Sequence, residues 1–163
     1  MKPQIVADIL VYDTRHNLTL VVITENRWGE SSEWAALRRQ NLYEYEPPPK
    51  APFFLLALPE HFYLWKNVEC ASKIEPTYDM DPKFYLQSFL KKSGLSLENL
   101  RQPDSFDILI GMALSGITLA YEKNDICSVY PQWFDKPNHK WLFESGLFDA
   151  IKRVIPNRFV GNI

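Results

Sequence analysis

The sequence has few cysteines and few glycines, and it has no long uninterrupted apolar segment. Cys70 and Cys127 are the only two cysteines among 163 residues. Neither belongs to a C-x-x-C pair or to a His–Cys cluster with zinc spacing, so they are typical of reduced thiols in a cytoplasmic protein. With only six glycines in the chain, there is no phosphate-binding glycine loop, and the G-x-S-x-G and H-E-x-x-H patterns are also absent.

The apolar run that begins at Ile5 is interrupted by Asp8 and Asp13. It is too short and too charged for a signal peptide or a membrane span, and no other window reaches the roughly 18 uninterrupted apolar residues of a spanning helix. We therefore expect a cytoplasmic protein with no membrane partner. The three histidines, His16, His61 and His139, share no metal-ligand spacing.

Neither sign of charge dominates the composition, because the net charge is −2 and 23% of the residues are charged. An apolar content of 46% excludes a disordered chain, which combines low hydrophobicity with high net charge. A strongly basic nucleic-acid-binding protein is disfavoured, although a local basic patch is compatible with these numbers. The length predicts one domain, residues 1–163, with a substantial core.

Short β-branched and apolar runs predict a series of strands. Ile5–Asp13 is expected to be a strand with Asp8 in its middle, and Leu18–Glu25 is expected to be a second strand after a polar hairpin turn. The second run is almost entirely apolar or β-branched, which is typical of a strand buried on both faces. Pro52–Leu58 and Phe62–Lys66 are predicted as the third and fourth strands.

A helix is predicted between the second and third strands. Ser31 or Ser32 can cap its first turn, and Trp34, Leu37 and Leu42 suggest an apolar stripe along it. The three consecutive prolines from Pro47 prevent its continuation. Because a helical crossover separates the second and third strands, we expect these two strands to be parallel in one sheet.

The rest of the chain is predicted to be mostly helical. A loop is expected over Val68–Asp81. Further helices are predicted over Pro82–Lys92, Ser105–Tyr121 and Trp141–Val154, with a short strand at Arg158–Val160. The predicted fold is therefore α/β, with a mixed central sheet of about four strands flanked by helices.

Asp8, the hairpin after it, and Ile23 and Glu25 at the end of the second strand resemble the PD-(D/E)XK superfamily, which has the restriction-endonuclease-like fold. The closest resemblance is to a bacterial group of that fold. The matching stretches are Ala7–Asp13, Leu20–Val22, Ser32–Ala36, Ala51–Pro59 and Phe62–Lys66, with a weaker match at Phe143–Leu147.

This resemblance implies a divalent-metal site. In active members, two carboxylates from adjacent strands hold a metal ion, usually Mg²⁺, and a lysine two residues beyond the second acid helps to activate water. Asp8 matches the first acid. Ile23 stands at the position of the second acid, and Glu25 stands at the position of the lysine. If the chain is active, the resemblance therefore implies Mg²⁺ or Mn²⁺ bound by Asp8 and Glu25.

Two interpretations of these acids remain open from the sequence. Glu25 is either a relocated ligand that completes a reduced site with Asp8, or the metal site has decayed and Glu25 pairs with a base or faces solvent. In the second case Asp8 is hydrogen-bonded to backbone, or is paired with Arg27 or with an arginine of the following helix. Arg38 and Arg39 on that helix either contact phosphates, or face solvent or pair with acids.

The functional expectation follows from these alternatives. The first hypothesis is a non-catalytic nuclease-fold protein that acts in binding or assembly, as a subunit of a larger bacterial complex or as a homo-oligomer. The second is a Mg²⁺-dependent DNA endonuclease that uses Asp8 and Glu25. The third is a DNA-binding protein that does not cleave and that uses Arg27, Arg38 and Arg39. The chain is 14% aromatic, which suits interfaces as well as a packed core.

Overall fold

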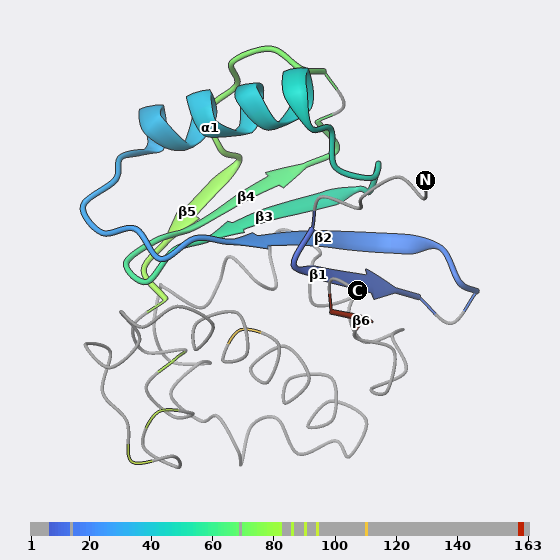
Figure 1. The fold of residues 1–163 in the computed structure, drawn as a ribbon, viewed down its shortest axis with the longest axis horizontal. Helices are drawn as coiled ribbons and strands as arrows, with labels where there is room; N and C mark the ends of the chain where they lie inside the picture. Colours follow the sequence, from blue (N-terminus) through green and yellow to red (C-terminus); the bar gives the residue numbers. More distant parts are fainter. Residues whose placement is uncertain are drawn as a thin grey trace.

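The computed structural model describes residues 7–82 except 14 and 69, together with residues 86, 90, 94, 110 and 160–161. In this part of the chain, a single helix lies against a mixed β-sheet (Figure 1). The elements are β1 (Ile9–Tyr12), β2 (Leu18–Thr24), α1 (Ser32–Tyr45), β3 (Phe53–Ala57), β4 (Phe62–Lys66), β5 (Tyr78–Met80) and β6 (Val160–Gly161). The predicted α/β class is confirmed at this level.

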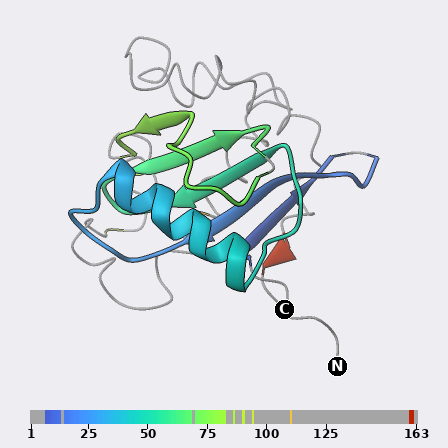
Figure 2. The same cartoon turned by 90° about the horizontal axis from the view of Figure 1, so that it is seen from above.

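The strand order in the sheet is β5-β4-β3-β2-β1-β6. β2 and β3 are parallel, with Leu20 opposite Phe53 and Ile23 opposite Leu56, and α1 provides the crossover between them (Figure 2). The prediction of parallel pairing after a helical crossover is therefore confirmed. The neighbouring pairs β1–β2, β3–β4, β4–β5 and β1–β6 are all antiparallel.

The sheet has six strands, so the expectation of about four was too low. The additional strands are at the two edges and are only three and two residues long. β5 lies in a segment that was predicted to be a loop, because a three-residue run shows no recognisable alternation. It pairs with β4 through Tyr63 opposite Asp79, and the Asp79 carboxylate lies 2.9 Å from Nδ1 of His61, the residue just before β4.

The hairpin turn between β1 and β2 is organised by one side chain. Asp13 Oδ1 accepts hydrogen bonds from the backbone N–H groups of Asn17 and Arg15, at 2.9 and 2.8 Å. These bonds, led by the one from Asn17, lower the pKa of the Asp13 carboxyl. The turn also places His16 at a φ of 67°. Asp13 therefore begins the turn, and β1 ends at Tyr12.

α1 begins and ends where the sequence predicts, and two of the three residues of the predicted apolar stripe are on the core side: Leu42 is buried and Trp34 packs against the core. Ser31 Oγ accepts a hydrogen bond from the backbone N–H of Trp34 at 3.2 Å, as an N-cap residue does. The buried positions are Ala35, Ala36, Arg39 and Leu42. Leu37, which was expected on the apolar stripe, is 43% exposed, so that assignment was wrong.

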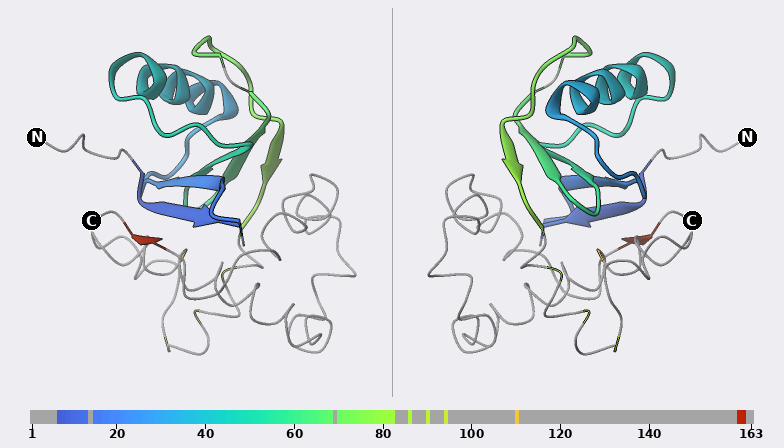
Figure 3. Two further views of the ribbon diagram at one scale, coloured as in Figure 1. Left: turned by 90° about the vertical axis from the view of Figure 1, so that its right-hand side faces the viewer. Right: turned by 90° about the vertical axis from the view of Figure 1, so that its left-hand side faces the viewer.

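Both faces of the central strands are buried. On the side of α1, the core contains Leu10, Val21, Ile23, Phe54, Leu56, Tyr63 and Trp65 from the sheet, with Ala35 and Leu42 from the helix. Figure 3 shows α1 over this face in two side views. The alternate residues Val22, Leu55 and Leu64 are also buried, which confirms that the second strand is covered on both faces. Each such side chain contributes about 1.5–3 kcal/mol by leaving water.

Most of the predicted C-terminal elements lie outside the described residues. This applies to the helices over 105–121 and 141–154, and to most of 82–92. Leu86, Leu90 and Ile110 are described, and each is helical and buried. β6 overlaps the strand predicted at 158–160 and pairs with β1 through Val160 opposite Leu10. In the described part of the chain, no helix has the length and apolar character needed to cross a bilayer.

Candidate functional site

An open hollow of about 690 Å³ lies where β2 ends and α1 passes over the sheet. It is lined by Asp8, Ile23, Thr24, Glu25, Asn26, Arg27, Trp34 and Arg38. The structure therefore brings together Asp8, Glu25, Arg27 and Arg38, four of the five side chains predicted to form a site. The fifth, Arg39, does not line this hollow.

The sheet register explains why the two acids meet. Asp8 directly precedes β1 and donates its backbone N–H to Val22 O at 3.0 Å, which continues the antiparallel pairing with β2. Glu25 directly follows β2 and donates its N–H to Ala57 O at 3.1 Å, which continues the parallel pairing with β3. Ile23 and Glu25 are two residues apart, so both side chains are on the face covered by α1.

Asp8 acts as a hydrogen-bond acceptor for the end of β2. Its Oδ2 accepts from the backbone N–H of Thr24 at 2.7 Å and from the Thr24 hydroxyl at 3.1 Å. A partly buried carboxylate needs such partners, because leaving it unpaired is costly. Of the two interpretations left open by the sequence, this arrangement matches the one in which Asp8 is hydrogen-bonded to backbone.

Glu25 is held between two arginines. Its Oε1 accepts a short hydrogen bond from Arg38 Nε, and its Oε2 lies 3.7 Å from Arg27 Nε. Only 15% of the Glu25 side chain is exposed, compared with 37% for Arg38 and 58% for Arg27. Arg27 also lies over the Trp34 ring, with its guanidinium carbon 5.5 Å from the ring centroid. Glu25 is therefore a paired acid, as the second interpretation expects.

The residues present do not fit the Mg²⁺ or Mn²⁺ that the PD-(D/E)XK resemblance implies. Ile23 offers no ligand atom and packs into the core with 6% exposure. Both oxygens of Glu25 already face guanidinium groups, and each of these would repel a cation by about 4 kcal/mol per unit charge at 4 Å near the surface. Among residues 7–82 and the few others described, no group of three or more potential ligands gathers.

Arg39 is not at this site, and its assignment as a phosphate contact was wrong. The side chain is fully buried, and its Nη1 and Nη2 donate to the carbonyls of Cys70 and Val68 at 3.0 and 2.9 Å. The guanidinium carbon lies 4.3 Å from the ring centroid of Tyr43 and 5.7 Å from that of Trp65. The helical spacing of Arg39 from the buried Ala35 was the sequence signal that places it on the inner face.

The loop that carries Arg27 is fastened by residues that the sequence did not indicate. Tyr63 Oη on β4 donates to Glu30 O at 3.0 Å, and Glu60 Oε1 accepts from the N–H of Gly29 at 3.0 Å. Gly29 has a φ of 76°, in the left-handed region that favours glycine. Burial, with nearby acids as smaller causes, raises the pKa of Tyr63 to about 12. Both contacts join residues some thirty positions apart in the chain, so no local sequence pattern indicates them.

Comparison of this chain with models of known families, with curated proteins and with solved structures finds no match. The resemblance to PD-(D/E)XK proteins therefore stays a prediction from the residues that carry it. The functional argument depends on the geometry of the hollow.

Adjacent arginines of α1 provide a matched test of these assignments. We expect Arg39→Ala to lower the free energy of unfolding by about 3 kcal/mol, because it leaves buried carbonyls unsatisfied and removes a buried side chain. Arg38→Ala should cost less than about 1 kcal/mol, because a half-exposed ion pair contributes little and Arg27 remains beside Glu25. Urea unfolding measures both changes, and equal losses would contradict the placement of the two side chains.

The raised pKa of Tyr63 predicts a loss of stability in alkali. In the unfolded chain the phenol ionises near its ordinary value of 10.0, whereas the folded state keeps the proton to about pH 12. The unfolded state thus binds fewer protons across this interval, and the free energy of unfolding falls as the pH rises through it. Tyr63→Phe should flatten this decline, whereas the control Tyr45→Phe, at a tyrosine that is 78% exposed, should not. Unfolding in urea from pH 8 to 12 gives the slopes, and identical slopes for Tyr63→Phe and the wild type would contradict the assignment.

Proposed function

We propose that this chain is a nuclease-fold protein without a working metal site, and that it acts by binding, as a subunit of a larger bacterial complex or as a homo-oligomer. The observation that carries the proposal is the set of partners around the two acids. Asp8 accepts from Thr24, and Glu25 is held by Arg38 and Arg27. Both carboxylates therefore stabilise the ends of β1 and β2 and the position of α1.

Charge balance supports this proposal. A catalytic site of the expected type needs surplus negative charge, because its carboxylates must attract a divalent cation that keeps much of its water shell. In this hollow the negative charges of Asp8 and Glu25 are matched by Arg27 and Arg38. Arg38 also lies on α1, which crosses the sheet, so the packing of α1 places the Arg38 guanidinium beside Glu25.

The rim of the hollow has the chemistry of a binding surface. Arg27 is more than half exposed and stacks on Trp34, which is itself half-buried. Tryptophan and arginine are the residue types most enriched where few side chains provide most of the binding energy. Tyr63 and Glu60 fasten the loop between β2 and α1. The Arg27–Trp34 pair therefore loses little conformational entropy when a partner binds.

The first test is cleavage of supercoiled plasmid in Mg²⁺ and in Mn²⁺. We expect no cleavage by the wild type and none by Asp8→Ala, because Glu25 would have to exchange two guanidinium groups for a metal ion. Light scattering on the same preparation reports the assembly state. Cleavage by the wild type that is abolished in Asp8→Ala would overturn the proposal and establish the alternative, a Mg²⁺-dependent DNA endonuclease that uses Asp8 and Glu25.

A DNA-binding protein that does not cleave is the second candidate, and the exposure of Arg27 and Arg38 at one hollow favours it. If this is the function, a labelled duplex should bind with a steep salt dependence, because phosphate contacts release counterions. The double variant Arg27→Ala/Arg38→Ala should then reduce the slope of log K against log salt by about 2. The control is Lys73→Ala, whose lysine pairs with Glu33 away from the hollow. No duplex binding at low salt would exclude this candidate and leave protein binding.

A further inference from the structure

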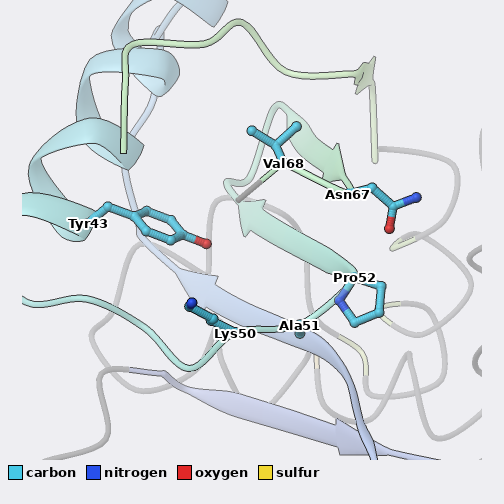
Figure 4. A pocket seen from close by; sticks show the side chains of 6 residues that line it. All are labelled: Tyr43, Lys50, Ala51, Pro52, Asn67 and Val68. Carbon is cyan, nitrogen blue, oxygen red and sulfur yellow. The ribbon is translucent and has the colours of Figure 1, made fainter. Parts of the chain in front are cut away.

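A second, smaller pocket lies at the C-terminal end of α1, on residues that the hollow does not use. Its volume is about 200 Å³, and it is lined by Tyr43, Lys50, Ala51, Pro52, Asn67 and Val68. These residues come from three parts of the chain: the last turns of α1, the segment that leads into β3, and the segment that follows β4. Figure 4 shows the phenol of Tyr43 reaching from α1 towards the segment that carries Lys50.

The walls of this pocket are fixed before any ligand arrives. The N–H of Asn67 donates to Pro52 O at 2.7 Å, which holds the segment that follows β4 against the segment that leads into β3. Asn67 has a φ of 54°, a left-handed conformation that residues other than glycine adopt rarely. The Tyr43 ring is held on two sides, edge to face with Phe54 at a centroid distance of 6.0 Å and below the Arg39 guanidinium at 4.3 Å.

The buried guanidinium of Arg39 contacts two residues that line this pocket, Val68 and Tyr43. Its two terminal nitrogens bond only carbonyls, one of them from the pocket residue Val68, and its Nε has no hydrogen-bond partner. Within the described residues, no carboxylate lies within ion-pair distance of this guanidinium. A fully buried cation without an opposing carboxylate favours a nearby anion, because attraction is poorly screened away from water.

The other charges near the pocket do not cancel this preference. The C-terminal end of a helix carries roughly half a negative charge. Glu44 and Glu46 also lie at this end of α1, but both are exposed and neither lines the pocket, so water screens their charges more than it screens the buried charge of Arg39. Lys50 makes no ion pair within the part of the chain that the structure describes. The other lining groups are apolar, with Ala51 and Pro52 next to Lys50 on the segment that leads into β3 and Val68 on the segment that follows β4. The pocket thus combines a cationic group with an apolar lining.

We propose that this pocket binds a small organic anion, with one carboxylate on an apolar body about the size of a single ring. The carboxylate lies near the Lys50 amine and the Tyr43 hydroxyl, and the apolar body lies against Ala51, Pro52 and Val68. A volume of about 200 Å³ equals the liquid volume of about seven water molecules. It is smaller than the roughly 300–1,000 Å³ of sites for drug-sized ligands, so a nucleotide does not fit. This site is independent of the function proposed for the hollow.

The test is a titration of the full chain with benzoate, followed by amide chemical shifts in NMR. Benzamide is the neutral analogue of the same shape, and benzamidine is the cationic one. We expect benzoate to bind with a Kd of about 1 mM, benzamide at least about tenfold more weakly, and benzamidine most weakly of all. The shifts should centre on residues 50–51 and 67–68, because Pro52 has no amide proton. Absence of benzoate binding, tighter binding of benzamidine, or shifts centred elsewhere would overturn the proposal.

Two lysine variants separate this pocket from general attraction to surface charge. Lys50→Met should weaken benzoate binding about tenfold, and because Lys50 is exposed the fold should be unaffected, which circular dichroism checks. Lys73→Met removes an exposed lysine that lies outside the pocket and pairs with Glu33, and it should leave the Kd unchanged. Equal Kd values for Lys50→Met and the wild type, or equal losses in the two variants, would refute the assignment.

Discussion

The arrangement of this protein depends on the parallel pairing of β2 with β3. Parallel neighbours require a crossover, and α1 supplies it by passing over one face of the sheet. The two strands are then covered on both faces, which is why they read as continuous apolar runs instead of alternating ones. Once α1 is fixed over this face, Arg38 reaches the end of β2 and Arg39 reaches the segment that follows β4.

In the hollow, the fold therefore places acidic side chains beside basic ones. Asp8 and Glu25 extend the hydrogen-bonding ladders beyond β1 and β2, and the Asp8 carboxylate also accepts from the backbone N–H of Thr24. Partly buried acids are tolerated at such positions only with partners, and Thr24, Arg27 and Arg38 are those partners. An arrangement of this kind stabilises the hollow, and it gives both Asp8 and Glu25 partners within the protein.

The sequence predicted the elements with strong local signals and missed those fixed by distant contacts. The apolar run of β2, the cap at Ser31 and the prolines after Tyr45 are local, and each was assigned correctly. β5 is three residues long and is defined by its partner β4, so it gave no pattern. At the site, Asp8 and Glu25 were located from the two predicted strands, although Asp8 lies just before β1 and not in its middle, and Glu25 lies just after β2. Their partners depend on how α1 sits over the sheet. Arg39 was misplaced because arginine is rarely buried, and that expectation outweighed its helical spacing from Ala35.

Arg38 and Arg39 are neighbours in the chain but point to different sides of α1, because successive helical residues are about 100° apart around the axis. The buried guanidinium, held by two carbonyls between aromatic rings, thus sets the rotation of the whole helix. A single residue gained or lost between Ser31 and Arg38 would rotate the cap and Trp34 by about 100° relative to Arg39 and turn them away from the end of β2. Substitutions in that stretch therefore preserve the arrangement, whereas insertions and deletions disrupt it.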